Sequence, residues 1–250
     1  LHIKSNLAKN LRFFRILGVG VALWGVIYGS FFGFKLPFAI VDTSTDVITI
    51  LIMSVVIGFI TVMTGLYLSG AKNIRMKDYA EAYNSGFAWM LILVGLALLA
   101  AGRLFPSLAI AGLIGQWLAI INAVGIVLVS IISAKSLKGL GPALFNLYNI
   151  SSYVGDLVSF TRLMALGLAG ASIGSAFNLI VSLFPPFARF SIGIVLFIAL
   201  HSINMFLSFL SGYVHGARLI FVEFFGKFYD GGGKAFKPLK PAGKYVRYKK

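Results

Sequence analysis

The sequence contains no cysteine and only seven acidic residues among its 250 positions. Without cysteine the chain can build neither a disulfide framework nor a thiolate metal site. Charged residues make up 12% of it, about half the share of a typical soluble domain, whereas hydrophobic residues make up 59%. The apolar runs are long and do not alternate with polar residues, as the strands of a transmembrane barrel would. The composition therefore predicts an all-α, polytopic transmembrane helical bundle whose main solvent is the lipid bilayer.

Signals for enzyme chemistry are missing as well. His201 and His215 lie 14 positions apart with no thiolate nearby, a spacing that does not suit a metal site. The glycines at 231–233 follow no strand and precede no GK[ST] sequence, so they do not form a phosphate-binding loop. We therefore expect no catalytic residue, no metal and no cofactor in this chain, and no site that hydrolyses ATP.

Six apolar segments are long enough to cross a membrane, since a helix needs roughly 20 residues to span a hydrocarbon core of about 30 Å. They are 16–34, 47–70, 82–102, 107–133, 149–184 and 190–225. They predict a transmembrane domain over 16–226, after a basic cytoplasmic leader over 1–15 and before a basic cytoplasmic tail over 227–250.

The last two segments are longer than one crossing requires. Each covers about 36 residues, or roughly 54 Å of helix, so these helices must tilt, kink or project from the membrane. We expect both helices to be continuous and tilted. The turn at Pro185–Pro186 predicts that they pack as an antiparallel hairpin.

Basic residues are distributed unevenly among the connections between these segments. With six spans, 17 of the 22 lysines and arginines lie before the first span, in alternate loops or in the tail, all on one side. The opposite side has only Lys35, Arg103 and Arg189. The positive-inside rule then places both termini in the cytoplasm. The net charge of +15 belongs to residues that flank the membrane and does not indicate a nucleic-acid partner.

Two arginines, Arg162 and Arg218, fall inside the long hairpin. An arginine at the centre of a membrane helix costs at least about 2.5–3.5 kcal/mol on insertion scales. Arg162 lies 13 residues inside its segment, and Asp156 is about 240° away around an ideal helix, so Asp156 is a poor partner for it. These features favour a functional charge at Arg162. Arg218 lies near the cytoplasmic end beside Glu223, where a structural ion pair is a stronger alternative than it is for Arg162.

Polar residues repeat along the last segment at steps of three and four. They are His201, Asn204, Ser208, Ser211, His215 and Arg218. A period of about 3.5 keeps them on one slowly drifting face, which predicts a wet cavity or a partner inside the membrane. A hydrogen-bonded seam between two helices is the alternative.

The fifth segment carries two polar sets, one on each side of Arg162. On the cytoplasmic side are Ser152, Asp156 and Ser159, and on the external side Ser172, Ser175, Asn178 and Ser182. The two sets point in directions roughly 120° apart on an ideal helix. Small residues dominate between Ala165 and Gly174, and small residues allow another helix to approach closely. This layout suits two half-channels that face a moving partner.

Three stretches resemble one known family. The sequence YVGDLVSFTRLMALGLAGASI (153–173) is similar to the arginine-bearing helix of subunit a, also called subunit I, of vacuolar- and archaeal-type rotary ATPases. The sequence YVHGARLIFVEFFGKFYDGGGKAFKPL (213–239) resembles the last helix and tail of that subunit, and IYGSFFGF (27–34) also looks familial. The family's membrane domain usually has eight helices after a large cytoplasmic arm, so we expect the arm and the first two helices to be missing here.

The resemblance implies a stator subunit that provides the ion half-channels of a rotary ATPase, for protons or sodium ions. Arg162 would face a rotor ring of small membrane subunits with buried carboxylates, and Arg218 and His215 would also act in ion translocation. The half-channel candidates are Ser152, Asp156, Ser159, Ser172, Ser175, Asn178, His201, Asn204, Ser208, Ser211 and Glu223. Further partners would be the peripheral stalk and the soluble ATPase head, reached through the missing arm.

The sequence departs from the eukaryotic members of this family at two positions. Gly170 stands where they tend to have histidine, and Ser208 where some have an acidic residue. These departures indicate a prokaryotic member, located in the plasma membrane.

A secondary ion-coupled transporter is the alternative function, because it could also use Asp156, Arg162 and the polar face of the last segment. Such a protein would usually show internal repeats and discontinuous helices around a site at the midplane of the membrane. The sequence has no convincing repeat, and its long segments predict continuous helices. We therefore favour the rotary stator.

The six-span topology predicts on which side of the membrane the loops lie. Cysteines introduced at Asn73 and Ser136 should react with an impermeant thiol reagent from the cytoplasm, and one at Pro186 from the outside. Labelling of all three positions from one side would contradict six spans.

Overall fold

The computed structural model describes residues 2–35, 41, 46–134, 140–233 and 236. Its α-helices are α1 (His2–Ile27), α2 (Val47–Arg75), α3 (Tyr79–Ala82), α4 (Ala88–Leu104), α5 (Ala109–Ala134), α6 (Leu140–Tyr148), α7 (Ile150–Ser159), α8 (Thr161–Ser182), α9 (Pro186–Ala188) and α10 (Ile194–Arg218). Two strands, β1 (Ser30–Phe31) and β2 (Phe34–Lys35), form an antiparallel hairpin. Short π-helical segments extend several helices, namely η1 (Tyr83–Phe87), η4 (Arg189–Gly193) and η5 (Leu219–Phe224). The 3-10 turns are η2 (Pro106–Leu108) and η6 (Phe225–Lys227).

Six helical stretches among the described residues are long and apolar enough to cross a membrane. Their bounds are Asn10–Ile27, Val47–Arg75, Tyr79–Leu104, Pro106–Ser133, Leu144–Ser182 and Pro186–Lys227. This confirms the all-α, polytopic architecture, to which the strands add only a short hairpin. The division into leader, transmembrane domain and tail stays a prediction, and most of the tail lies outside the described residues.

The first helix differs from its predicted bounds at both ends. α1 begins at His2, inside the expected leader, and ends at Ile27 rather than at position 34. It ends there because Gly29, Phe32 and Gly33 have φ angles of 56°, 50° and 76°, in the left-handed region that a right-handed helix does not use. The chain therefore turns sharply after α1 and forms β1 and β2.

The fifth span is not one continuous α-helix, and that expectation was wrong. α7 ends at Ser159, Phe160 has φ −71° and ψ −19°, and α8 begins at Thr161. The Phe160 amide donates to the Leu157 carbonyl, three residues back, at 3.2 Å. Thr161 Oγ1 donates to the Val158 carbonyl at 2.7 Å, a local side-chain bond that competes with the α-helical pattern. The last span also combines two helix types, because π-helical segments flank the α-helix α10 on both sides.

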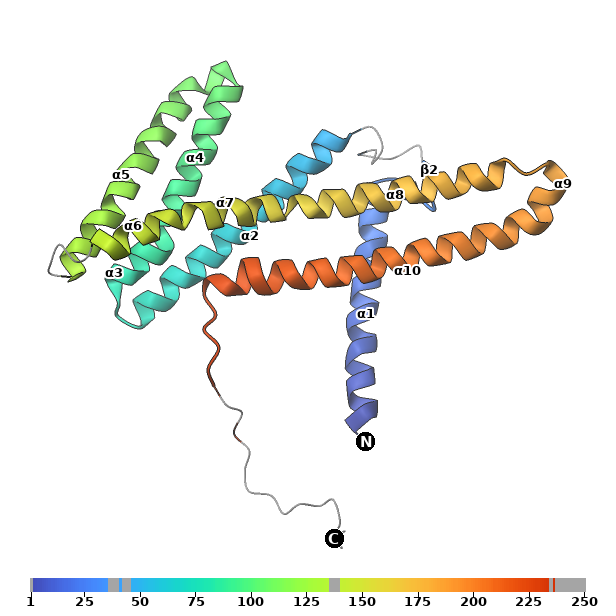
Figure 1. Ribbon diagram of the computed structural model, residues 1–250, viewed down its shortest axis with the longest axis horizontal. Helices are drawn as coiled ribbons and strands as arrows, with labels where there is room; N and C mark the ends of the chain where they lie inside the picture. Colours follow the sequence, from blue (N-terminus) through green and yellow to red (C-terminus); the bar gives the residue numbers. More distant parts are fainter. Residues whose placement is uncertain (1, 36–40, 42–45, 135–139, 234–235, 237–250) are drawn as a thin grey trace, which may run out of the picture.

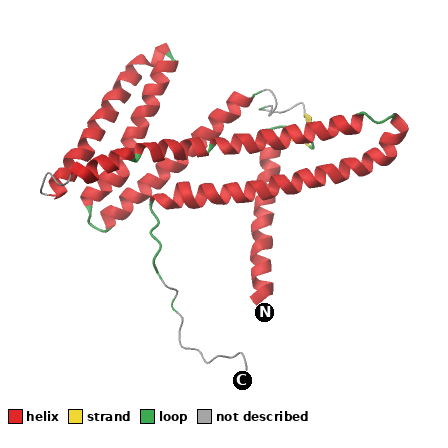
Figure 2. Ribbon diagram, in the orientation of Figure 1, coloured by secondary structure: helices red, strands yellow, loops and turns green. Residues whose placement is uncertain are grey.

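Two helical hairpins dominate the architecture (Figures 1 and 2). α7 and α8 run beside α10 as one long hairpin that turns at α9, and α4 packs along α5 as the second. α2 contacts α7, α8 and the η5–η6 end of the last span. α1 crosses the long hairpin (Figure 1) and touches α10 through aromatic rings, with Phe14 5.2 Å from Phe209 between ring centres. The predicted antiparallel pairing of the last two spans is therefore present.

The core lies where α2 meets α4, α5, α7 and η5. Its buried side chains are Val62, Leu66, Ala88, Trp89, Ile92, Leu93, Ile126, Tyr153, Phe160 and Leu219. Phe160 packs on Gly58 of α2, where an added Cβ would lie 2.6 Å from Phe160 Cγ. The missing side chain at Gly58 leaves the space that the phenyl ring occupies, and this contact holds the break in the fifth span against α2.

Glycines also set the distance between α4 and α5. A Cβ added at Gly95 would lie 2.6 Å from the Gly115 carbonyl oxygen, and one at Gly102 would lie 2.5 Å from Gly112 Cα. Membrane helices approach this closely only where both surfaces carry small residues. The second hairpin is therefore a tightly packed pair, and it meets the long hairpin at the α7 end, where the Trp89 and Tyr153 rings lie 4.8 Å apart between centres (Figure 1).

The contact between Gly58 and Phe160 predicts the effect of Gly58→Val. The added side chain must push the buried ring aside, and such overpacking costs about 1–3 kcal/mol. Thermal unfolding of the purified chain in detergent should therefore have a lower midpoint. Gly18→Val is the matched control, because nothing lies within 4 Å of a Cβ added at Gly18. Equal losses in the two variants would contradict the contact.

Candidate functional site

Arg162 lies on the first turn of α8, just after the break at Phe160. Its side chain is half-buried, and its Nη1 atom is buried without a hydrogen-bond partner among the described residues. An unpaired buried donor costs about 1–3 kcal/mol, and more when the group is charged. Arg162 therefore has a buried donor that no group within the described ranges satisfies.

Asp156, the acidic residue closest to Arg162 in sequence, is paired with another cation. Its carboxylate forms an ion pair with Lys227 of η6, and the two side chains are only 16% and 12% exposed. The Lys227 ammonium also lies 4.2 Å from the centre of the Tyr153 ring, within the range of a cation–π contact. This pair ties α7 to the end of the last span. It closes the open end of the long hairpin, opposite the turn at α9.

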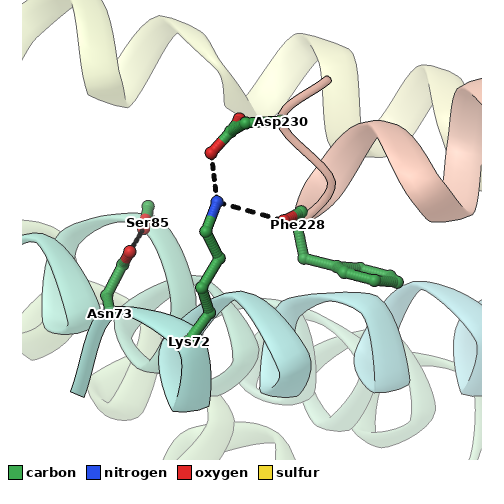
Figure 3. Close-up of polar contacts among 5 residues, drawn as sticks. All are labelled: Lys72, Asn73, Ser85, Phe228 and Asp230. Atoms are coloured by element: carbon green, nitrogen blue, oxygen red, sulfur yellow. Dashed lines mark hydrogen bonds and ion pairs between the residues drawn. The ribbon is translucent and has the colours of Figure 1, made fainter. Parts of the chain in front are cut away.

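A second lysine holds the segment that follows η6 (Figure 3). Lys72 of α2 donates to the Phe228 carbonyl at 3.2 Å and forms an ion pair with Asp230. The Lys72 and Asp230 side chains are 33% and 85% exposed. Beside them, Asn73 donates to Ser85 Oγ at 3.0 Å and ties α2 to η1 (Figure 3).

Arg218 and Glu223 form no ion pair with each other, and the role of Arg218 stays a prediction. Arg218 is exposed, whereas Glu223 is only 2% exposed and its Oε2 atom has no hydrogen-bond partner within the described ranges. The chain between them is π-helical, and its wider turns aim Glu223 differently from an α-helix. The open end of the hairpin thus holds a buried carboxylate oxygen without a hydrogen-bond partner among the described residues.

A cavity of about 410 Å³ lies between Arg162 and the α9 turn, and we call it the turn-side cavity. α1, the β1–β2 turn, α8 and α10 all contribute to its wall. Its lining includes Tyr28, Phe32, Gly33, Gly167, Gly170, Gly174, His201, Asn204 and Ser208. The described residues that line this cavity include no charged side chain.

Hydrogen bonds join the two long spans at this cavity. His201 Nε2 lies 2.9 Å from Asn178 Oδ1, Asn178 Nδ2 donates to the Phe32 carbonyl at 2.8 Å, and Asn204 Nδ2 donates to the Gly170 carbonyl at 3.2 Å. The structure therefore brings Asn178 of one predicted set together with His201 and Asn204 of the other. This part of the polar face is the hydrogen-bonded seam considered as the alternative, and it borders a cavity.

The other candidates are not joined in this way. Ser152, Ser172, Ser175 and Ser208 are exposed, and Ser159, Ser211 and His215 are half-buried. Within the described part of the chain, these side chains and Arg218 form no hydrogen bond with one another. Their places along the hairpin stay predictions of half-channel positions.

The small residues of α8 divide between two faces. Gly170 and Gly174 face α10 and the β1–β2 turn, where a Cβ at Gly170 would lie 3.2 Å from Ser208 Oγ. Ala165, Gly167 and Ala169 are exposed, and nothing lies within 4 Å of a Cβ added at Gly167. One face thus packs inside the chain, and the other leaves a smooth surface for a partner.

Three groups at these sites had no part in the prediction from sequence. They are the Phe32 carbonyl, Tyr153 and Lys227. The turn was signalled by the glycines on both sides of Phe32 in IYGSFFGF. No local signal pairs Lys227 with Asp156, because 71 positions separate them.

The fold and the site define a multi-span helical membrane protein whose long hairpin holds a half-buried arginine, with one nitrogen unpaired among the described residues, and a cavity partly lined by polar side chains. No protein-family model matches the chain. It is 26% identical to the A-type ATP synthase subunit I of Methanocaldococcus jannaschii, over 92% of this chain and 38% of that protein. It is 30% identical to the A-type subunit I of Pyrococcus abyssi, over 86% and 33%. It is also 30% identical to the V-type ATP synthase subunit I of Chlamydia trachomatis, over 67% and 26%.

The chain is therefore a homologue of subunit I, or subunit a, of the A- and V-type ATP synthases. It spans about a third of the length of the curated relatives that it matches.

The two lysine–aspartate pairs should differ in strength. Lys227→Met leaves Asp156 buried without a partner, which costs about 3–5 kcal/mol, whereas exposed pairs such as that of Lys72 contribute about 0–1 kcal/mol. The thermal unfolding midpoint of the purified chain should fall much further for Lys227→Met than for Lys72→Met. Adding Asp156→Asn to Lys227→Met should recover part of the loss. Equal shifts in the two single variants would contradict the burial argument.

Proposed function

We propose that this chain is the membrane part of the stator of a rotary A/V-type ATPase, and that Arg162 separates two ion half-channels. The homology to subunit I supports the membership of the chain in such a complex. The observation that carries the role of Arg162 is its buried Nη1 atom, which has no partner among the described residues. A rotor ring that brings carboxylates past α8 would supply the missing anion.

The proposed path has two halves. On the external side, an ion would reach the turn-side cavity, which His201, Asn204 and Ser208 help to line. On the cytoplasmic side, Glu223 offers the buried free oxygen, whereas Asp156 is occupied by Lys227. An ion that enters from one side neutralises a ring carboxylate, travels around the ring through lipid, and leaves by the other side.

Arg162 would act in two ways in this mechanism. Its charge favours the ionised form of the approaching carboxylate and so expels the bound ion. A fixed positive charge in a low dielectric also prevents a cation from passing directly between the half-channels. The exposed small residues Ala165, Gly167 and Ala169 would let the ring approach α8 closely.

Other partners follow from the proposed assembly. The peripheral stalk and the soluble ATPase head would connect to a part of the protein outside this sequence. The membrane would be the plasma membrane of a prokaryote, with both ends of this chain on the cytoplasmic side. The uneven distribution of basic residues supports that orientation.

One observation favours the alternative, a secondary ion-coupled transporter. The break at Phe160, beside Arg162, is a feature of the discontinuous helices that such proteins use. Here the break covers one residue, and its amide and carbonyl groups still form hydrogen bonds three residues away. The chain therefore does not unwind to expose backbone groups to an ion, and the rotary stator is the better supported function.

The proposal predicts that Arg162→Ala abolishes ATP-driven ion uptake by vesicles that contain the assembled complex. Arg162→Lys should fail or nearly fail, because lysine lacks the planar fork that can hold a carboxylate from two directions. Arg218→Ala should have a milder effect, since Arg218 is exposed near the end of α10.

Assembly is measured in parallel, by copurification of the ring and the ATPase head with each variant. Normal ion uptake by an assembled Arg162→Ala complex would contradict the proposed function. ATP-independent, substrate-coupled transport by the chain without a ring would favour the transporter instead.

A further inference from the structure

His201 is a titratable side chain that lines the turn-side cavity and is packed among aromatic rings. It is only 3% exposed. The rings of Phe197, Phe32 and Phe177 lie 4.3, 5.5 and 6.1 Å from its own ring between centres. A group this well enclosed keeps one orientation, so its two nitrogens have distinct surroundings.

The hydrogen bonds around Asn178 determine which nitrogen of His201 carries a proton. The Phe32 carbonyl can only accept, so the amide nitrogen of Asn178 must point toward it, at 2.8 Å. The amide oxygen then faces His201 Nε2 at 2.9 Å and can only accept. His201 must therefore donate through Nε2–H, and in a neutral imidazole this leaves Nδ1 bare.

No hydrogen bond occupies Nδ1 of His201 within the part of the chain that the structure describes. The groups packed around the ring come from three elements. They are Phe177 and Asn178 of α8, Phe32 of the β1–β2 turn, and Phe197 and Asn204 of α10. Tyr28 is the other titratable residue that lines the cavity, and its described lining contains no charged side chain. A protonated His201 would thus meet no fixed cation among the described lining residues.

The same cavity is poorly equipped for a sodium ion. Sodium sites of secondary transporters use backbone carbonyls of unwound helices and the C-terminal ends of half-helices, whereas α8 and α10 are uninterrupted where they line this cavity. Here the Phe32 carbonyl and the Asn178 side-chain oxygen each already accept one hydrogen bond, and the Gly170 carbonyl accepts one from Asn204. Among the described residues, no group of three or more His, Cys, Asp and Glu side chains could hold a metal ion.

We infer that His201 is a proton relay in the external half-channel, with its state set by Asn178 and the Phe32 carbonyl, and that the transported ion is the proton. This inference rests on the proposed function. In the relay step, hydronium in the cavity transfers a proton to Nδ1 and becomes water, and the imidazole becomes imidazolium. The imidazolium then returns that proton from Nδ1 through water to an ionised ring carboxylate, which becomes neutral.

The test uses vesicles that contain the assembled complex. His201→Gln keeps an N–H donor for Asn178 but cannot take up a second proton. Loss of a proton-transfer group costs typically about 10²-fold or more in rate, so ATP-driven proton uptake should fall by about that factor while the complex stays assembled. Wild-type uptake should persist without sodium, and the residual uptake of His201→Gln should lose the dependence on external pH that the wild type shows. A merely structural role would lower the amount of active complex and leave the shape of the pH profile unchanged.

The outcomes separate this inference from the proposed function. Normal uptake by Arg162→Ala would overturn both. An inactive Arg162→Ala complex together with wild-type uptake by His201→Gln, or with strict sodium dependence, would overturn only the relay.

A second measurement covers the case in which His201→Gln does not assemble. The ¹⁵N NMR spectrum of the wild-type chain with labelled histidine should show the Nε2–H tautomer for His201, assigned by variants at His2 and His215. A proton on Nδ1 of neutral His201 would overturn the relay.

Discussion

Holding a guanidinium group within the apolar layer of a membrane is costly, and the packing around Arg162 holds it without neutralising it. Phe160 anchors the preceding turn in the space above Gly58, so α8 starts from a fixed point on α2. The Lys227–Asp156 pair anchors α7 from the other side and removes the acidic residue closest to Arg162 in sequence. One guanidinium nitrogen of Arg162 therefore has no hydrogen-bond partner among the described residues, and the proposed role toward a partner's carboxylate rests on that donor.

The two polar ends of the long hairpin are built differently. Toward the α9 turn, glycines bring α8 and α10 close enough for amide side chains to bond across the contact, and the remaining space is the turn-side cavity. Toward the open end, the π-helical segment η5 places Glu223 in the protein interior, and Lys227 closes the hairpin. One end thus offers neutral polar groups and a histidine, whereas the other offers a carboxylate. This asymmetry agrees with two separate routes that do not merge at Arg162.

Much of the architecture could be predicted because hydropathy and charge are local properties of a segment. The six spans, the hairpin at Pro185–Pro186 and the depth of Arg162 follow from runs of apolar residues and the positions of a few prolines and basic residues. The polar face that contains His201 and Asn204 also follows from helical spacing. The break at Phe160 could not be predicted from the sequence, because a run of apolar and small residues is compatible with a continuous helix. It depends on a glycine of α2 that lies about a hundred positions earlier in the chain.

The sequence by itself determined that this is a helical membrane protein with an arginine in its fifth span, and that it is similar to subunit I of A- and V-type ATP synthases. Tertiary structure alone decided which polar groups are free to act. Asp156 is paired by a lysine 71 positions away, and Asn178 is oriented by a carbonyl 146 positions away. Whether a carboxylate or an imidazole can exchange a proton depends on its partners in space. The packing of the helices determines those partners, and no periodic pattern in the sequence predicts them.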